Sequence, residues 1–253
     1  MTYELIDLTI GYGKTVVADG INATLEEGKM ACLIGQNGAG KSTLLRTLCC
    51  FQPSLDGKKL LDGKDVSRLS AQRLSTMIGV VLTDRVDVQG MTVRELVAMG
   101  RSPYTDFWGK IKPEDETIVE EAIRLTGIEA LASRQINTLS DGERQKVMIA
   151  KTLAQQTPII LLDEPTAFLD FPSKVETMLL LKRLAHEQGK SILISTHDLD
   201  LALQTADTLW LMGKSSLIVG PPSALAQDNT LALFFANPNV HFNAGELRFT
   251  IKR

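Results

Sequence analysis

The chain has 253 residues, 44% of them hydrophobic and 23% charged, which is enough apolar material for one packed domain with a small subdomain. Its 27 Lys and Arg residues against 30 Asp and Glu give a formal net charge of −3, which argues against a nucleic-acid-binding protein. No apolar run approaches the roughly 18 residues that cross a bilayer, and the N-terminal residues include no signal-like stretch. Three cysteines without a CxxC pair suit a reduced cytosolic compartment. We therefore expect a globular intracellular protein.

The N-terminal part of the chain predicts strands that lead to a glycine-rich turn. Strands are expected at Tyr3–Ile10, Val16–Leu25 and Met30–Ile34. The last of these is entirely apolar and bounded by glycines, which suits a strand buried on both faces of a parallel sheet. The turn Gly35–Gly40 follows it, and Lys41–Cys50 then predicts a helix.

Helical periodicity dominates the middle of the chain, after hairpin-like residues (Asp56–Asp65) and a second buried strand (Met77–Leu82). Helices are predicted at Thr92–Met99, Glu114–Thr126 and Gly142–Ala154. Because strands resume directly afterwards, we interpret residues of about 84–157 as a helical insertion. Strands and a helix then alternate as a parallel α/β sheet requires, at Ile159–Leu162, Lys174–Glu187, Ser191–Ser195 and Thr208–Met212. Pro221-Pro222 is expected to close this region, and Phe242–Ile251 predicts a terminal hairpin.

Residues 35–42 read GQNGAGKS and fit the pattern G-x-x-x-x-G-K-[ST]. Such glycines let the backbone curl so that its N–H groups point at phosphate oxygens, and the following helix adds its positive end. Lys41 would neutralise the β- and γ-phosphates, and the Ser42 hydroxyl would bind Mg²⁺. The alternative is a chance glycine loop, which the flanking strand and helix disfavour. The expected nucleotide contacts are Gly35, Gln36, Asn37, Gly38, Ala39, Gly40, Lys41, Ser42 and Thr43.

Two acids end the next buried strand, in the run IILLDEP at residues 159–165. Asp163 is well placed to hold Mg²⁺ beside the phosphates. Glu164 directly after it can orient or deprotonate an attacking water. The alternative is a pair of solvated carboxylates at a strand end, which the phosphate-loop pattern makes less attractive.

The segment Leu139–Gln145 reads LSDGERQ and comes just before a predicted helix. Ser140 and Gly142 offer a hydroxyl, backbone N–H groups and a positive helix end, which together would form a second phosphate-binding surface. Ser140 with Glu143 three residues later also fits a capping box, which needs no ligand. Both interpretations can hold at once, because an exposed cap is what a phosphate would meet.

This segment resembles the signature sequence of ATP-binding cassette (ABC) ATPases, usually LSGGQ, and the resemblance extends from Tyr3 to about Leu225. Residues 167–170 resemble the D-loop, with Asp170 at its acidic position, and residues 195–198 resemble the switch segment, with His197. Tyr12 matches the aromatic position that stacks on adenine. The resemblance implies an α/β P-loop NTPase (RecA-like) parallel-sheet core with an N-terminal antiparallel β subdomain and an inserted α-helical subdomain. The ATPase domain would span 1–225, with a short appendage at 226–253.

The same resemblance implies a mechanism with ATP and Mg²⁺ as cofactors. Two copies would form a homodimer head to tail, each ATP held between one copy's Lys41 loop and the other's Ser140 segment. Glu164 would activate water, His197 would hold the γ-phosphate, and Asp170 would couple the two sites. Loss of the γ-phosphate on hydrolysis would let this sandwich open, a switch biased by its ligand.

The stretch Glu95–Tyr104 resembles the V-x-x-G-R-x-P-[YH] segment of ATPases that power importers of iron complexes, haem or cobalamin. This implies two membrane-spanning permease subunits, a substrate-binding protein and no nucleic acid, with the chain peripheral on the cytoplasmic side of the inner membrane. Tyr104, Phe107 and Trp108 would either pack inside the insertion or face the permease.

One position departs from the family pattern. ABC ATPases usually have a glutamine where this chain has Thr83, followed by Asp84, and Gln89 is too far along to replace it. The shorter Thr83 side chain would need a bridging water or a backbone movement to reach the same ligand.

Two rival functions fit parts of the sequence. A soluble ABC-type ATPase of a cofactor or iron–sulfur assembly complex would keep every nucleotide motif, but the iron-importer-like stretch weighs against it. A small-molecule kinase would explain the Lys41 loop and leave the signature and His197 segments unexplained. The coiled-coil insertions of DNA-repair relatives do not fit, because only about 120 residues separate Lys41 from Asp163.

Overall fold

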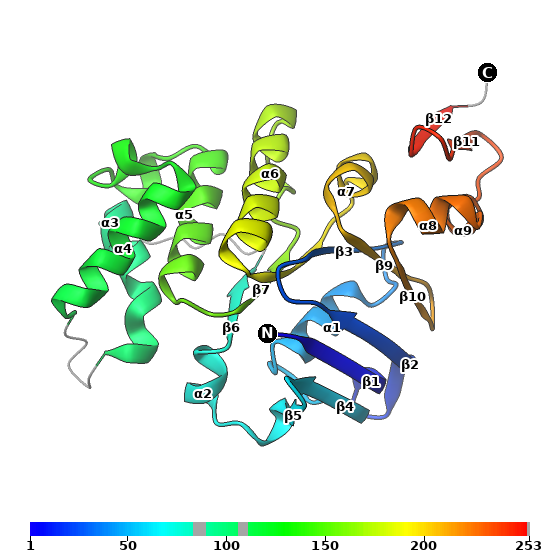
Figure 1. The fold of residues 1–253 in the computed structure, drawn as a ribbon, viewed down its shortest axis with the longest axis horizontal. Coiled ribbons are helices and arrows are strands. Elements are labelled where there is room, and N and C mark those ends of the chain that lie inside the picture. Colours follow the sequence, from blue (N-terminus) through cyan, green and yellow to red (C-terminus); the bar gives the residue numbers. More distant parts are fainter. Residues whose placement is uncertain (83–89, 106–110, 252–253) are drawn as a thin grey trace. The chain divides into compact units, whose positions relative to one another are not determined.

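The computed structural model describes residues 1–82, 90–105 and 111–251. They divide into a first unit, Met1–Arg68 with Leu181–Arg253, and a second unit, Leu69–Leu180. The chain therefore enters the second unit once and returns to complete the first, as the colours of Figure 1 show.

An antiparallel sheet in the first unit has the strand order β2-β1-β4-β5. These strands are β1 (Tyr3–Tyr12), β2 (Thr15–Leu25), β4 (Asp56–Leu61) and β5 (Lys64–Asp65). Buried and exposed positions alternate along β2, as expected of a strand with one face on a core. The strands predicted at Tyr3–Ile10 and Val16–Leu25 are confirmed as β1 and β2.

A second sheet of the first unit contains β3 (Met30–Gly35), β8 (Ser191–Ser195), β9 (Thr208–Met212) and β10 (Leu217–Gly220). β3 pairs in parallel with both β8 and β9, and β10 adds an antiparallel edge to β9. Every residue of β3 and β8 is buried, which explains the apolar runs Met30–Ile34 and Ile192–Ile194 within them. The helices α1 (Lys41–Leu48) and α7 (Leu199–Thr205) pack on β3.

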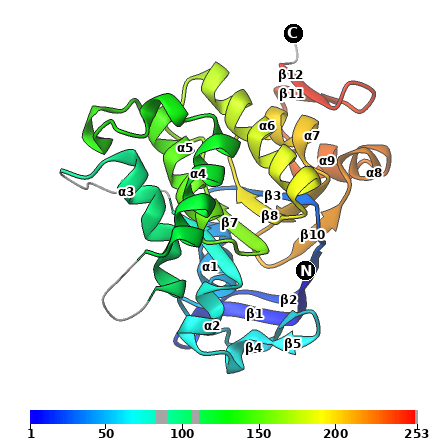
Figure 2. The same cartoon turned by 60° about the vertical axis from the view of Figure 1, so that its left-hand side comes forward.

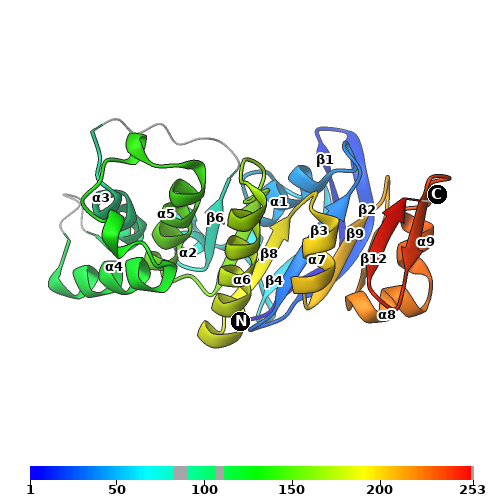
Figure 3. The same cartoon turned by 90° about the horizontal axis from the view of Figure 1, so that it is seen from above.

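The C-terminal residues of the first unit form a small α/β segment. It comprises α8 (Pro222–Gln227), α9 (Thr230–Phe234) and a hairpin of β11 (Val240–Asn243) and β12 (Arg248–Ile251), seen together in Figure 3. The hairpin confirms the prediction at the tail. Pro222 differs from expectation, because it begins α8 instead of closing the region; a proline is well tolerated in the first helical turn, where its missing N–H has no partner to lose.

The second unit contains a parallel pair of strands, β6 (Ile78–Val81) and β7 (Ile159–Asp163), and most of its helices lie between them in sequence. The helices α3 (Val93–Ala98), α4 (Pro113–Thr126) and α5 (Asp141–Ala154) pack against one another, side by side in Figure 2. Short helical segments complete the unit: α2 (Ala71–Ser75) and the 3₁₀ turns Met99–Tyr104, Glu129–Leu131 and Ile136–Thr138. The helix α6 (Phe171–Gln188) begins in the second unit and ends in the first.

Arg101 ties the helices of the second unit together from a buried position. Its Nε donates to Asp115 at the start of α4 at 2.8 Å, and its Nη1 donates to the carbonyl oxygen of Ala154 at the end of α5, also at 2.8 Å. The Tyr104 ring lies 4.0 Å from the guanidinium carbon. A hydrogen bond from the backbone of Lys112 and the Arg101 bond lower the pKa of Asp115 below its usual value. The stretch that resembles importer ATPases thus builds the core of this unit.

Among the residues that the structure describes, no helix has the length and apolarity that crossing a bilayer requires.

Candidate functional site

The glycine loop after β3 approaches its neighbours so closely that side chains would collide. A Cβ on Gly35 would lie 2.3 Å from the carbonyl oxygen of Met212 in β9. Gly40 has a φ of 103°, and a Cβ there would lie 2.6 Å from Val17 and 2.9 Å from Cε of Met212. The glycines at these two positions therefore have a steric cause, and at Gly40 a conformational one as well.

Lys41 is the first residue of α1, and its buried side chain folds back over the loop. Its Nζ donates hydrogen bonds to the carbonyl oxygens of Gly35, at 2.9 Å, and Gln36, at 3.4 Å. Both acceptors are neutral, and a phosphate oxygen is a stronger acceptor for an ammonium group. The cation is therefore already held at the loop that an anion would enter.

The start of α1 has no side-chain cap, because its N-cap residue is Gly40 and its first turn contains no acid. The first N–H groups of a helix have no partner within it, and the helix dipole favours an anion there. Ser42 in this turn is exposed, and its hydroxyl has no hydrogen-bond partner within the described part of the chain. This helix start can offer a phosphate both N–H donors and a hydroxyl.

Tyr12 lies beside the same helix start. It ends β1 with 51% of its surface exposed, and its hydroxyl oxygen lies 3.3 Å from Oγ1 of Thr43 in the first turn of α1. The bond fixes the end of an aromatic side chain that remains open to solvent. Its ring can provide a flat apolar surface for a nucleobase.

His197 reaches the edge of the sheet where the loop begins. Strand β8 runs parallel to β3, with Ser195 opposite Leu33, and the Thr196 N–H donates to the carbonyl oxygen of Leu33 at 3.1 Å. Because the carboxyl ends of parallel strands share one edge, the exposed His197 follows β8 at the edge where the glycine loop follows β3. The first unit thus brings together Tyr12, the loop and His197.

In the second unit, Asp163 and Glu164 are both half-buried at the end of β7. Glu164 has a φ of 47°, a left-handed conformation that is uncommon for residues other than glycine. The Ala167 N–H donates to the carbonyl oxygen of Glu164 at 3.1 Å and closes the turn that holds it. Backbone conformations of this kind cluster at functional sites.

Ser140 is the N-cap of α5, and the predicted capping box is confirmed. Its Oγ accepts the Glu143 N–H at 3.3 Å, while the Glu143 carboxylate accepts the Ser140 N–H at 2.8 Å and its hydroxyl at 3.0 Å. These two bonds from Ser140 hold the pKa of Glu143 below its usual value, with Arg134 and Lys146 adding smaller effects. Ser140 is nevertheless exposed, so its hydroxyl and N–H remain accessible to a ligand.

Ser173 lies next to both Gly142 and Asp170. A Cβ on Gly142 would lie 3.2 Å from Oγ of Ser173. The Ser173 N–H donates to Oδ1 of Asp170 at 3.2 Å, and hydrogen bonds from the Ser173 hydroxyl and N–H lower the pKa of this carboxyl. Asp170 therefore stabilises the start of α6, and the second unit groups the signature glycine with the D-loop acid.

Sequence reasoning missed Met212, whose buried side chain packs against the glycine loop. The contact arises because β9 pairs with β3, with Met212 opposite Gly35, and no local pattern reports such a pairing. Four residues singled out in the sequence lie outside the described residues: Thr83, Gln89, Phe107 and Trp108.

A family model described as ABC transporter matches residues 18–167. The chain belongs to the ABC transporter family. Its relatives include an uncharacterized ABC transporter ATP-binding protein of Methanocaldococcus jannaschii, 43% identical over 84% of this chain and 73% of that protein. The iron(3+)-hydroxamate import ATP-binding protein FhuC of Bacillus subtilis is 38% identical over 83% of this chain and 78% of its own length.

Solved structures agree with this assignment. A transporter assigned to the metal-chelate ABC type, in an inward-facing conformation, superposes with a TM-score of 0.81 at 26% identity, over 98% of this chain and 95% of the other. The cassette therefore has the α/β P-loop NTPase fold, with a parallel-sheet core, an antiparallel β subdomain and a helical subdomain. As a member of this family it is an ATPase that binds ATP.

Proposed function

We propose that this chain is the ATP-hydrolysing subunit of an importer that carries an iron complex (a siderophore or haem) or cobalamin across the cytoplasmic membrane. The observation that carries the proposal is the similarity to the iron(3+)-hydroxamate import protein over most of both chains. The metal-chelate type of the matched transporter and the importer-like stretch around Arg101 support the same class of cargo.

The phosphate groups of ATP would lie in the glycine loop, with adenine on Tyr12. Lys41 would exchange its two carbonyl acceptors for phosphate oxygens, and the uncapped start of α1 would donate its N–H groups. Glu164 would take the proton of the attacking water, and His197 would donate a hydrogen bond to the γ-phosphate. Each step uses a side chain that sits at a strand or helix end.

Ser42 and Asp163 would hold the Mg²⁺ that accompanies ATP. A hydroxyl and a carboxylate oxygen are the hard ligands that this ion prefers, and the Ser42 hydroxyl is exposed with no partner in the described ranges. When bound, the ion neutralises phosphate charge.

Two copies would pair head to tail around two ATP molecules. The Ser140 hydroxyl now donates to Glu143, and the γ-phosphate of the partner's ATP would replace that acceptor. The N–H of Gly142 would add a donor at the same helix start, and Asp170, linked to it through Ser173, would connect the two nucleotides. Each ATP would thus accept hydrogen bonds from both copies. Loss of its γ-phosphate would remove the contact with the copy that contributes Ser140 and let the two copies separate.

Residues 1–225 would form the ATPase domain, with a helical insertion at about 84–157 and a short appendage at 226–253. Two permease subunits and a substrate-binding protein would complete the importer on the cytoplasmic side of the inner membrane.

The test combines purification and transport in cells that lack the chain. The tagged chain should co-purify with a polytopic membrane protein. Expression of the chain in the deletion strain should restore uptake of radiolabelled ferric siderophore. E164Q should retain ATP affinity while kcat falls about 10²–10⁴-fold, as expected on loss of a general base, and uptake should stop. E187Q, which changes an exposed carboxylate of α6, is the matched control and should behave as wild type.

Two results would overturn the proposal in different places. Co-purification with soluble scaffold proteins alone, with normal uptake in the deletion strain, would favour an assembly ATPase. Near-normal turnover by E164Q would remove Glu164 from its role and leave the transport assignment standing.

A further inference from the structure

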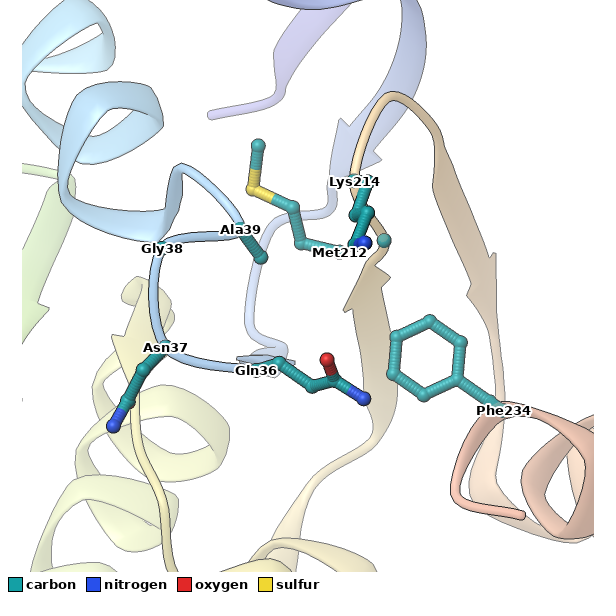
Figure 4. A pocket seen from close by; sticks show the side chains of 8 residues that line it. Gln36, Asn37, Gly38, Ala39, Met212, Lys214 and Phe234 are labelled. Atoms are coloured by element: carbon teal, nitrogen blue, oxygen red, sulfur yellow. The ribbon is translucent and has the colours of Figure 1, made fainter.

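A cavity of about 470 Å³ lies in the first unit against the outer part of the glycine loop (Figure 4). Three segments that are far apart in the sequence line it: the loop itself, the turn between β9 and β10, and α9. The lining residues are Gln36, Asn37, Gly38, Ala39, Met212, Gly213, Lys214 and Phe234. Its volume falls within the roughly 300–1,000 Å³ that is usual for small-molecule sites.

The cavity shares the loop residues Gln36–Ala39 with the groups proposed to bind ATP, but not the other nucleotide contacts. Lys41, Ser42, Tyr12 and His197 are absent from its lining, although the loop residues Gln36–Ala39 contribute one wall. The loop would therefore have a nucleotide at its helix side and a second ligand at its β9 side.

Its polar groups favour an anion. Lys214 is the one charged residue among the described residues that line the cavity. In the part of the chain that the structure describes, neither its ammonium group nor the Gln36 carboxamide has a hydrogen-bond or ion-pair partner. Figure 4 shows the Gln36 side chain directed toward Phe234, while Asn37 points away from both. A ligand with one negative group would satisfy the unpaired lysine.

Its apolar groups favour a flat ring. The Phe234 ring is held edge-on against Phe235, with centroids 4.9 Å apart. Gly213 presents no side chain to this ring, and a Cβ there would lie 3.9 Å from it. The Met212 side chain extends toward the loop, on the side away from Phe234 (Figure 4), and adds an apolar group to the lining. Planar aromatic ligands suit a wall of this composition.

We propose that this cavity binds a small planar aromatic anion, with its ring against Phe234 and its negative group at Lys214. Because the ligand would contact residues of the phosphate loop, its binding and that of ATP can influence each other through Gln36–Ala39, and any such coupling is reciprocal. The site is an addition to the nucleotide site and does not depend on which cargo the importer carries.

The test is a fluorescence titration of the full chain with 1-anilinonaphthalene-8-sulfonate, an aromatic anion. We expect saturable binding that 2-naphthoate displaces and 2-naphthylmethylammonium, of similar shape and opposite charge, does not. K214Q should weaken binding about fivefold, the effect of losing one partly exposed charge contact. F234L should weaken it by a similar factor. K64Q, which removes an exposed lysine remote in sequence from the lining, should leave it unchanged.

Three outcomes would overturn the proposal. They are equal binding by K214Q, K64Q and wild type, displacement by the naphthyl cation as readily as by the anion, and full competitive displacement by a non-hydrolysable ATP analogue. The last would assign the probe to the nucleotide site. Lys214 is an exposed turn residue, so K214Q should not affect folding. K214Q therefore still tests the proposal if F234L disturbs the folding of the C-terminal segment.

Discussion

Two helix starts are proposed to hold the same phosphate, and they are built in opposite ways. The start of α1 has a glycine N-cap, no acid in its first turn and a lysine cation beside it. The start of α5 has a complete capping box and two acids, Asp141 and Glu143, in its first turn. The first has no side-chain acceptor for its N–H groups, whereas the second provides its own.

This difference indicates that the two helix starts would have different roles in binding ATP. In the proposed mechanism, the loop at α1 would offer its N–H donors and its lysine to an anion, so it would bind ATP in a single copy of the chain. The start of α5 folds fully without a ligand, and its two negative side chains oppose a phosphate. In the proposed dimer, it would bind phosphate only after the other copy's Lys41 and Mg²⁺ had neutralised much of the charge on ATP. Each prediction below tests one side of this contrast.

The largest expected effect is on nucleotide affinity at the α1 side. K41A should weaken ATP binding by about 100-fold, because a hydrogen bond to a charged group contributes about 1.5–3 kcal/mol and the acidic start of α5 cannot substitute. Titration with a fluorescent ATP analogue measures this, with K64A as the control for loss of a lysine. Micromolar ATP affinity retained by K41A would contradict the role proposed for Lys41 at the start of α1.

A second effect separates two glycines of the loop. G38A and G40A both place alanine at a positive φ, which costs about 1–2 kcal/mol. G40A also forces a Cβ into Val17 and Met212, which should add about 1–3 kcal/mol, whereas no atom lies within 4 Å of the Cβ position at Gly38. Urea unfolding of the nucleotide-free chain should show G40A as the less stable variant. Equal stability would mean that the loop relaxes away from these contacts.

A third effect isolates the ligand role of the α5 cap. S140A and T92A each remove a capping box of the same geometry, at α5 and α3, so each should lower the free energy of unfolding by about 1 kcal/mol. Only S140A should also weaken ATP-dependent dimerisation, measured by sedimentation of chains that contain E164Q. If both variants dimerise alike, the Ser140 hydroxyl serves the helix alone.

The smallest effect is a pH dependence at the start of α5. Because the folded chain lowers the pKa of Glu143, its cap contributes stability above the unfolded value of 4.5, and this contribution disappears as pH falls through the lower folded value. Hydrogen exchange at the first turn of α5 should therefore lose protection as the pH falls below 4.5, after correction for intrinsic rates. The first turn of α1, without an acid, should change less. E143Q should abolish the difference.

Local sequence patterns predicted the elements that carry the motifs. The strand before the glycine loop, the helix after it and the capping box at Ser140 are each encoded within a few residues, by apolar runs, glycines and a Ser-x-x-Glu spacing. These patterns can be recognised in a single sequence because the interactions that they encode are between residues close together in the chain.

What the sequence did not predict depends on pairing between distant segments. Met212 reaches the glycine loop only because β9 pairs with β3, and Phe234 lines the cavity only because α9 follows the β9–β10 turn. Strand β10 and helix α8 were also missed, since short edge elements carry weak periodicity and Pro222 favours a break as readily as a helix start.

Arg101 has a consequence for how relatives of this cassette are recognised. Arg101 is 5% exposed. Its guanidinium group donates hydrogen bonds to Asp115, Ala154 and Gln156, all of which belong to the helical unit. The side chain therefore does not itself meet a cargo, and what the stretch encodes is the assembly of the helical unit. A search with this stretch would find cassettes by the architecture of that unit, and it would bear on the cargo only where importers of one class share the architecture.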